Sequence, residues 1–185
     1  MRFLISFVNS SLALGGFDWK SGELFWQISA DRLRACGICY HENSLLISSD
    51  DEVRRFTPSG QTAVRLPGPY PSQAHSLHMI DGSTFGVADT GNSVVRVYST
   101  AFEHLTDLAP FSDWPQLPDD AVHLNDFAVT PYGIIASCFD FRPWRAVQSR
   151  FKDRKLWSTS GMGVLINISD GHGAGRLVGY GLNHP

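Results

Sequence analysis

The chain has 185 residues, of which 43% are hydrophobic and 18% are charged, so it can bury the core of one globular domain. Its 15 basic and 18 acidic residues give a formal net charge of −3 and form no basic block, which excludes a nucleic acid or an anionic membrane as the expected partner. No apolar run approaches the ~20 residues that cross a bilayer.

The N-terminal run FLISFV, residues 3–8, follows Met1 and Arg2 and is the first apolar segment of the chain. A charged start before an apolar run is found in signal peptides, but polar residues from Asn9 onward interrupt this one at once. We therefore predict a first β-strand over 3–8 and a cytoplasmic protein, with secretion as the alternative.

Three cysteines are an odd number for a chain of this length, which is not typical of a disulfide framework. Cys36 and Cys39 form a Cys-x-x-Cys pair, but a β-type pattern surrounds them and directs residues three apart to opposite faces. We therefore expect reduced thiols, with no redox or zinc site at this pair.

Short runs rich in Val, Ile, Leu, Phe and Tyr alternate with clusters of Gly, Pro, Asn, Asp and Ser along the whole chain. No segment sustains an apolar stripe of period 3.6, so the pattern predicts an all-β protein. Ser-Gly or Asp-Gly lies between strand-like runs at Gly22, at Gly60 and in NISDGHGAG, residues 167–175. These are tight turns in which glycine takes a positive φ.

Two segments repeat the same order of elements, namely residues 37–60 and 76–100. Each has an apolar strand, a polar turn, a strand that ends in Asp, and then a strand containing Val and Arg. Asp50 and Asp89 are 39 residues apart, and a third copy reaches Asp140. A period near 40 with about four short strands is typical of a β-propeller blade.

We therefore predict a β-propeller of four-stranded antiparallel blades, present in part, with about four blades and the start of a fifth at GLNHP. The whole chain, 1–185, forms a single propeller domain in this prediction. The predicted blades are 3–30, 34–67, 75–109 and 123–179. The basic, aromatic segment 141–161 is an insert in the fourth blade, expected to be a solvated helix or loop.

Two stretches carry a resemblance to known propellers. FGVADTGNSVVRVYS resembles the NHL repeat, and LNDFAVTPYGIIASCFD resembles the Asn-Asp strand of the gluconolactonase and regucalcin family. Both families are six-bladed propellers. The layout of residues 3–140 also resembles an uncharacterised family of six-bladed propellers in which a His-[Ile/Leu]-Asn-Asp segment opens one blade. The segment Asp89-Thr90-Gly91-Asn92 is interpreted as a structural turn, with Gly91 at positive φ.

The segment HLND, residues 123–126, directly precedes a strand that is predicted to be innermost in its blade. Residues that enter an innermost strand face the axial pocket of a propeller. Matching Leu77 to Phe127 places His75 opposite Asn125 and Ser76 opposite Asp126, with residues 183–184 as a further equivalent pair. His78 lies on the opposite strand face from His75, so it is assigned to packing.

Two interpretations of these residues stay open. In the first, Asn125, Asp126 and one of the histidines, His75 or His123, bind a ligand or a divalent cation, with Ca²⁺ favouring the oxygens. In the second, Asp126 holds the blade entrance through backbone N–H groups, Asn125 caps a turn, and the histidines satisfy one another or water.

The gluconolactonase resemblance implies that Asn125 contacts a metal or substrate and that Asp126 supports it or acts as the catalytic base. The chain departs from that pattern because no Glu lies at the mouth of the first blade; Glu23 follows a turn at the opposite end. Other catalytic motifs, such as Gly-x-Ser-x-Gly and His-Glu-x-x-His, are absent from the sequence.

The first functional prediction is therefore a propeller that binds a small molecule or a protein at its axial face near Asn125. A metal-dependent hydrolase of lactones or esters and a truncated structural remnant are the alternatives, so enzymatic activity is left open. Exposed blade edges also predict self-association, since unpaired strands are templates for pairing.

Overall fold

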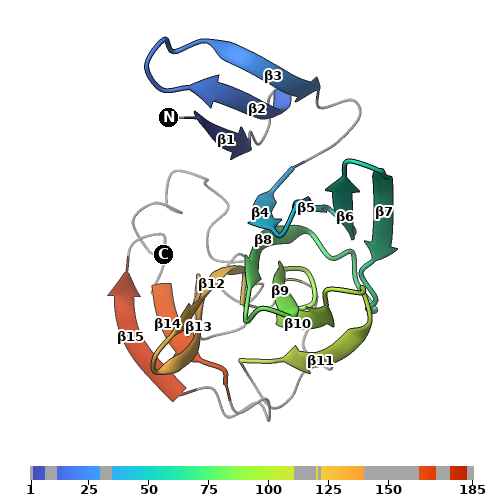
Figure 1. Cartoon of the computed structure of the whole chain (residues 1–185). Helices are drawn as coiled ribbons and strands as arrows, with labels where there is room; N and C mark the ends of the chain where they lie inside the picture. The colour runs from blue at the N-terminus through green and yellow to red at the C-terminus, as the bar shows by residue number, and fades with distance from the viewer. Residues whose placement is uncertain are drawn as a thin grey trace.

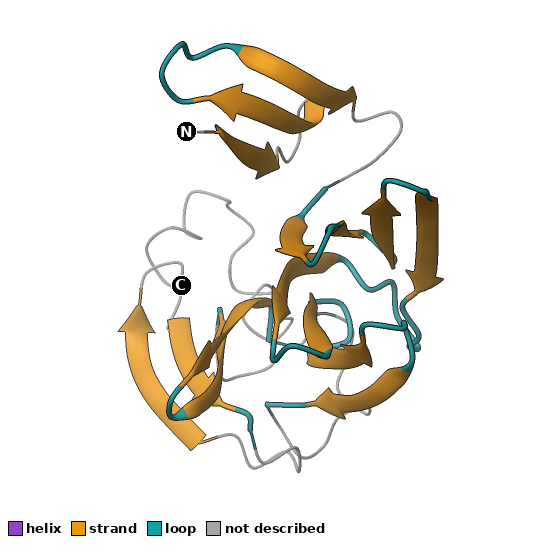
Figure 2. Cartoon of the chain, viewed as in Figure 1, coloured by secondary structure: helices purple, strands orange, loops and turns teal. Residues whose placement is uncertain are grey.

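The computed structural model of the protein describes residues 2–6, 12–29, 35–110, 120, 122–139, 163–169 and 176–182. Within these residues the regular structure consists of β-strands joined by turns and loops, with no helix (Figure 2). It follows that the described part contains no helix capable of crossing a membrane. The predicted all-β fold class is confirmed. The insert 141–161, residues 183–184 and the glycine-rich turn 171–175 lie outside the described residues.

The strands form four antiparallel sheets, each built from consecutive strands (Figure 1). The first sheet contains β1 (Arg2–Ser6), β2 (Leu12–Asp18) and β3 (Leu24–Ser29). The second contains β4 (Gly37–His41), β5 (Ser44–Ser49), β6 (Glu52–Thr57) and β7 (Gly60–Arg65). The third contains β8 (Ala74–Met79), β9 (Thr84–Asp89), β10 (Val94–Ser99) and β11 (His104–Leu108). The fourth contains β12 (Leu124–Thr130), β13 (Gly133–Cys138), β14 (Gly163–Asn167) and β15 (Arg176–Leu182).

This arrangement is that of a partial β-propeller, with each sheet forming one blade. Three blades have the four strands predicted from the sequence, and the first has three within the described residues. The tight turns occur where glycine was expected, because Gly22 has φ +72° and Gly60 has φ +148°. Only glycine adopts such backbone angles without strain. The assignment of 1–185 to a single domain stays a prediction.

Apolar side chains fill the spaces between neighbouring blades. Leu14 of the first blade packs with Ile47 of the second, and both are fully buried. The other face of the second blade, with Leu46 and Val53, packs against Leu77 of the third. The cluster between the third and fourth blades contains Ala88, Val95, Val97, Leu108, Leu124, Phe127, Ala136, Cys138, Val164 and Ile166. The hydrophobic core therefore lies in the interfaces between successive blades.

The first strands of the second, third and fourth blades lie side by side. β8 contacts β4 on one side and β12 on the other (Figure 1). Gly37 lets β4 approach β8 closely, since a Cβ there would lie 2.6 Å from the backbone nitrogen of Leu77. Such a separation is too short for any side chain. The residues at the start of β8 and β12 are thereby brought together.

The turn after β9 contains a buried ionic network. The Arg96 Nε atom donates to Asp89 Oδ2 at 2.5 Å, and its Nη1 atom donates to Asp107 Oδ2 at 2.8 Å. The Asn92 amide donates to Asp89 Oδ1 at 2.9 Å and to the carbonyl oxygen of Tyr70 at 3.1 Å. The carboxylates and the guanidinium are thus paired, as buried charges require.

The interpretation of this turn as structural is therefore confirmed, but the conformation assigned to Gly91 is wrong. The residue with a positive φ is Ser93, at +58°. Gly91 is required for a different reason, because a Cβ there would collide with the carbonyl oxygen of Pro71. Its N–H also donates to the carbonyl oxygen of Ser72 at 2.7 Å. The turn that contains Gly91 therefore packs closely against the linker segment before β8.

We predict that Arg96→Met lowers the free energy of unfolding by about 3–5 kcal/mol, because it leaves the Asp89 carboxylate buried without its main partner. Urea unfolding at neutral pH measures this loss. Arg65→Met is the matched control, since Arg65 pairs with Asp51 at 3.2 Å but its side chain is 83% exposed. The control should lose no more than about 1 kcal/mol. Equal losses in the two variants would contradict the network's role.

Candidate functional site

The starts of β8 and β12 form a cluster of polar side chains that we call the axial mouth. Two neighbouring blades contribute to it, and the matched residues of their first strands, such as Leu77 and Phe127, are 50 positions apart in the sequence. The axial mouth consists of His75, Ser76, His78, Asp120, His123, Asn125 and Asp126. The structure thus brings together all four predicted site residues, His75, His123, Asn125 and Asp126.

Both inner strands have a β-bulge at this place. In β8 the register with β9 shifts between Ala74 and Leu77, and in β12 the register with β13 shifts between Leu124 and Asp126. A bulge adds one residue to a strand and redirects the side chains beside it. A β-bulge therefore sets the direction of His75 and Ser76 in one blade and of Asn125 in the next.

His123 is held by the segment that leads into β12. Its Nδ1 atom lies 3.0 Å from Asp120 Oδ1 and 3.1 Å from Asp120 Oδ2. Both residues have positive φ, +47° for His123 and +51° for Asp120, which is uncommon outside glycine. The His75 ring meets the His123 ring edge-on, with the centroids 5.6 Å apart. The two histidines therefore contact each other, as the structural interpretation expected.

His78 belongs to the axial mouth, so its assignment to packing is wrong. Its Nε2 atom lies 2.8 Å from Asp126 Oδ1, and the two side chains are 46% and 57% exposed. The His78 ring also meets the Phe127 ring edge-on. The assignment failed because the face of β8 that contains His78 was taken to be buried. In the structure β8 lies beside β12, the first strand of the next blade.

Asp126 also stabilises the start of its own strand. Its Oδ1 atom accepts a hydrogen bond from the Phe127 N–H at 2.7 Å. Its carbonyl oxygen accepts from Ser137 Oγ at 3.3 Å. Asp126 therefore fulfils the structural interpretation and still presents an exposed carboxylate paired with an imidazole.

One polar group in the axial mouth is buried without a hydrogen bond, namely the Asn125 Nδ2 atom, which has no partner among the described residues. The Ser76 hydroxyl faces Asp126 and helps to lower the pKa of that carboxyl. Buried donors without a partner are uncommon, because each forgoes the hydrogen bonds it would make in water. The Nδ2 atom of Asn125 is therefore the group best placed to receive a bound molecule or an ordered water.

Hydroxyl groups from the preceding blades fix the backbone of the mouth. Ser48 Oγ of the second blade donates to the carbonyl oxygen of His75 at 3.2 Å. Thr90 Oγ1 of the third blade donates to the carbonyl oxygen of Leu124 at 2.6 Å. Each inner strand is thus tied to the blade before it. The sequence contains only common Ser and Thr residues at these places, so no motif pointed to them.

Burial lowers the pKa of His75, and the nearby His123 lowers it further. Asn125, Asp120 and Asp126 act in the opposite direction. Burial penalises the charged imidazolium, whereas the carboxylates favour it. His75 is therefore neutral at pH 7 and offers one ring nitrogen as donor and the other as acceptor.

Burial by itself would raise the pKa of Asp126, but the hydrogen bonds that it accepts outweigh this effect and hold its pKa below the usual range. The strongest of these hydrogen bonds comes from His78, and another comes from the Phe127 N–H. Hydrogen bonds to the charged form favour that form. The axial mouth therefore combines an ionised carboxylate with a neutral, half-buried imidazole.

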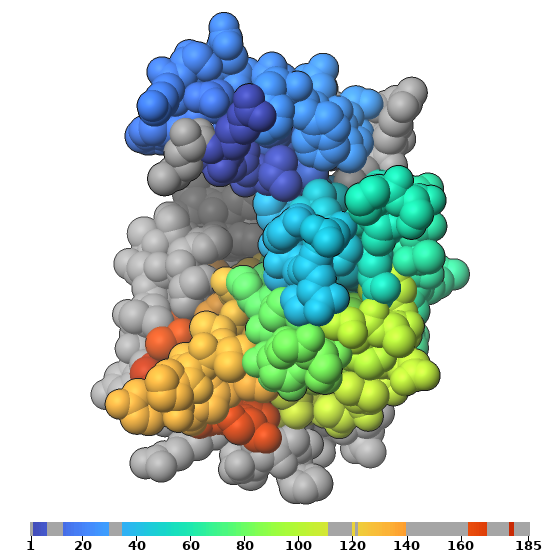
Figure 3. Space-filling view, viewed as in Figure 1, coloured from blue at the N-terminus to red at the C-terminus, as the bar shows by residue number. Residues whose placement is uncertain are grey.

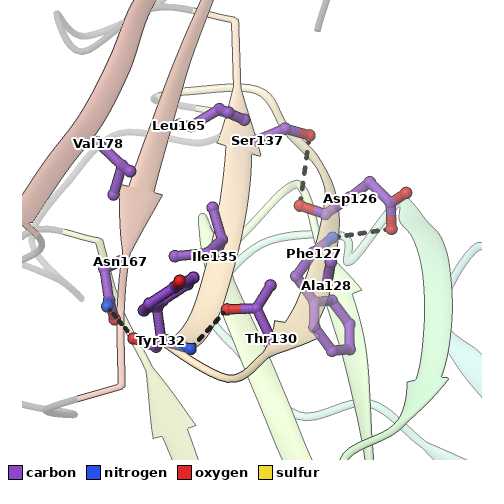
Figure 4. Close-up of a pocket in the computed structure, with 10 residues that line it drawn as sticks. All are labelled: Asp126, Phe127, Ala128, Thr130, Tyr132, Ile135, Ser137, Leu165, Asn167 and Val178. Carbon is purple, nitrogen blue, oxygen red and sulfur yellow. Dashed lines mark hydrogen bonds between the residues drawn. The ribbon is translucent and has the colours of Figure 1, made fainter.

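A hollow of about 760 Å³ adjoins the axial mouth on the open face of the fourth blade (Figure 4). Asp126 lies at its edge and is shared with the mouth. Side chains that point out of the same sheet face form the rest of the lining, namely Ala128, Thr130, Tyr132, Ile135, Ser137, Leu165, Asn167 and Val178, together with Phe127. The polar mouth thus continues into an apolar surface.

The described residues contain no group of three or more His, Cys, Asp or Glu side chains placed to hold a metal ion. The predicted calcium or other divalent-cation site at Asn125 and Asp126 stays a prediction. The thiols of Cys39 and Cys138 are not in disulfides.

No protein-family model matches the chain. Over 99 residues, 51% of the chain, it is 29% identical to the BBSome complex member BBS2 of Danio rerio, of which it spans 13%. A candidate 6-phosphogluconolactonase of Bacteroides uniformis superposes on 97% of the chain with a TM-score of 0.57 and 14% identity. The hydrazine synthase of Kuenenia stuttgartiensis superposes on 92% with a TM-score of 0.55 and 14% identity. The chain spans 54% and 42% of these two proteins, and both likenesses show the fold alone.

We predict that His75 makes the protein less stable in mild acid. Its folded pKa lies below the unfolded value of 6.5, so the unfolded chain binds the proton more readily. The stabilisation is present above about pH 6.5 and is lost as the pH falls toward the folded pKa. Urea unfolding at about pH 7.5 and pH 5.5 should show a larger loss for the wild type than for His75→Gln.

His104→Gln is the control for this measurement, because His104 pairs with Asp107 at 2.8 Å on another strand and is 40% exposed. It should show the same loss as the wild type. A His75→Gln variant with an unchanged pH dependence would show that His75 is not desolvated in the folded protein.

Proposed function

We propose that this chain is a propeller that binds a small hydroxylated molecule, such as a polyol or a sugar derivative, at the axial mouth. The observation that carries the proposal is the unpartnered Asn125 Nδ2 atom, in a mouth that also contains the His78–Asp126 and His123–Asp120 pairs. A hydroxylated ligand would supply the acceptor that this amide lacks.

The groups of the axial mouth complement hydroxyl groups in both directions. The carboxylates of Asp120 and Asp126 accept hydrogen bonds, and Asn125 Nδ2 donates one. His75 does either, because its lowered pKa keeps the ring neutral. The hollow beyond Asp126 offers apolar surface to the carbon skeleton of a ligand. A few convergent polar groups beside apolar surface are typical of small-molecule sites.

A hydrolase that acts on lactones or esters is a second candidate, and the His78–Asp126 hydrogen bond of 2.8 Å favours it. An imidazole oriented by a carboxylate is a common arrangement for a general base that activates water. A divalent cation at Asn125 and Asp126 would polarise the lactone carbonyl in this version. The likeness to a candidate 6-phosphogluconolactonase supports the candidate only at the level of the fold.

A third candidate function is the binding of a protein partner at the axial face. The match to a member of the BBSome complex supports a role in a protein assembly. We place the protein in the cytoplasm as part of the same proposal, because the thiols of Cys39 and Cys138 are not in disulfides.

The test is thermal melting of the 185-residue protein against a panel of polyols, sugar acids and their lactones, each with and without Ca²⁺. A ligand that binds the folded state raises the melting temperature by mass action. We expect a shift for the wild type and for Tyr40→Ala, whose side chain is 69% exposed on the second blade. Asn125→Ala should weaken binding about tenfold, the cost of roughly 1.4 kcal/mol for one lost hydrogen bond.

An equal shift in Asn125→Ala and in the wild type would contradict binding at the axial mouth. If a lactone in the panel is hydrolysed and His78→Gln loses that activity, the hydrolase replaces simple binding as the function. A shift that appears only with Ca²⁺ and disappears in Asp126→Asn would place the cation in the mouth.

A further inference from the structure

The axial mouth contains two carboxylates, and each of them is paired with an imidazole. Asp126 Oδ1 lies 2.8 Å from His78 Nε2, and Asp120 Oδ1 lies 3.0 Å from His123 Nδ1. A pair of this kind has one negative charge when its imidazole is neutral and no net charge when the imidazole is protonated. Neither pair is therefore positive at any pH at which the carboxylates are ionised.

The other members of the axial mouth add no positive charge at neutral pH. Burial lowers the pKa of His75, which keeps its ring neutral, and the side chains of Ser76 and Asn125 do not ionise. Lysine and arginine do not occur among the described residues assigned to the mouth. Arg96 of the third blade is 2% exposed within its ionic network. The described mouth thus presents a negative or zero net charge to a ligand.

Asp126 is the carboxylate that a bound molecule can reach. Its side chain is 57% exposed, whereas that of Asp120 is 17% exposed. Burial acts against its ionisation, but hydrogen bonds from His78, Ser76 and the Phe127 N–H outweigh burial and hold its pKa below the usual range. An ionised carboxylate has lone pairs for about four hydrogen bonds, so these donors leave room for one more.

His75 connects this carboxylate with the unpartnered Asn125 amide. Its ring lies against the Asn125 side chain and within range of the Asp126 charge. The strands that contribute these residues, β8 and β12, lie side by side in the third and fourth blades (green and orange in Figure 3). Asn125 and Asp126 are consecutive, with Cα atoms about 3.8 Å apart, so the Asp126 charge acts on a ligand at Asn125 over a range comparable to the Debye length of about 8 Å in physiological salt.

We infer, on the basis of the function proposed above, that the axial mouth selects hydroxylated molecules by charge and prefers those with an amine, such as amino polyols and amino sugars. The hydroxyl groups of the ligand bind Asn125 and His75, and its ammonium group pairs with Asp126. A charge-assisted hydrogen bond of this kind is roughly twice as strong as a neutral one. A sugar acid would place a further negative charge beside Asp126, so the same mouth disfavours it.

Ligands with the same carbon skeleton and different end groups test this preference, namely the neutral polyol glucitol, its amine glucamine and the corresponding acid, gluconate. Calorimetric titration of the 185-residue protein at about pH 7.5, without divalent cations, keeps the amine and the acid charged. We expect glucamine to bind at least about fivefold more tightly than glucitol, and gluconate at least about fivefold more weakly. The difference between glucamine and glucitol should shrink in about 1 M salt, which screens exposed charges.

Asp126→Asn removes the charge and keeps an oxygen that can accept a hydrogen bond from the Phe127 N–H. This variant should bind glucamine and glucitol equally. Glu103→Gln is the matched control, because it neutralises an exposed carboxylate in the turn between β10 and β11, and it should keep the preference of the wild type. Asn125→Ala should weaken the binding of glucitol and glucamine alike.

The charge preference and the proposed function fail in different ways. If none of the ligands binds, the proposed function is contradicted and the charge preference with it. If glucitol binds but glucamine is no tighter, or gluconate is as tight, binding at the mouth stands and the charge preference is overturned. A full preference for glucamine in Asp126→Asn would overturn the pairing of the ammonium group with Asp126.

Discussion

The need of each blade to cover two apolar faces is the constraint on which this structure depends. A sheet with Leu46 and Val53 on one face and Ile47 on the other is stable in water only when a neighbour buries each face. Stacking the blades in a row meets this need for all internal faces. The same stacking places β8 beside β12, and the axial mouth results from that juxtaposition.

β-Bulges then create a polar site where β8 and β12 lie side by side. The bulges in β8 and β12 interrupt the alternation of side chains between the two faces of each strand. They change the direction of the His75 and Asn125 side chains at equivalent positions of neighbouring blades. The Ser48 and Thr90 hydroxyls hold the two strands by their carbonyl oxygens, so the polar side chains stay available for other contacts. The buried Arg96 network stiffens the third blade from which half of the mouth projects.

The sequence predicted the blades because their signals are local and repeated. Asp50 and Asp89 recur with the blade period, and matching the repeats brought His75 to the level of Asn125. The His78–Asp126 pair escaped prediction because it depends on which neighbour borders β8, a property of the assembled row. The positive φ predicted for Gly91 was wrong for a similar reason. A glycine is needed there because the carbonyl oxygen of Pro71 leaves no room for a Cβ, and turn rules do not include that contact. The first blade likewise has three described strands where a repeat would give four.

The meeting of β8 and β12 at the axial mouth is tested most directly by a nuclear Overhauser measurement on protein with labelled histidine, assigned with His75→Gln and His123→Gln. The edge-on rings of His75 and His123, with centroids 5.6 Å apart, predict a cross-peak between their ring protons. This cross-peak should be present, and both resonances should shift when a hydroxylated ligand binds. Absence of the cross-peak in the folded protein would show that β8 and β12 do not meet at a common mouth.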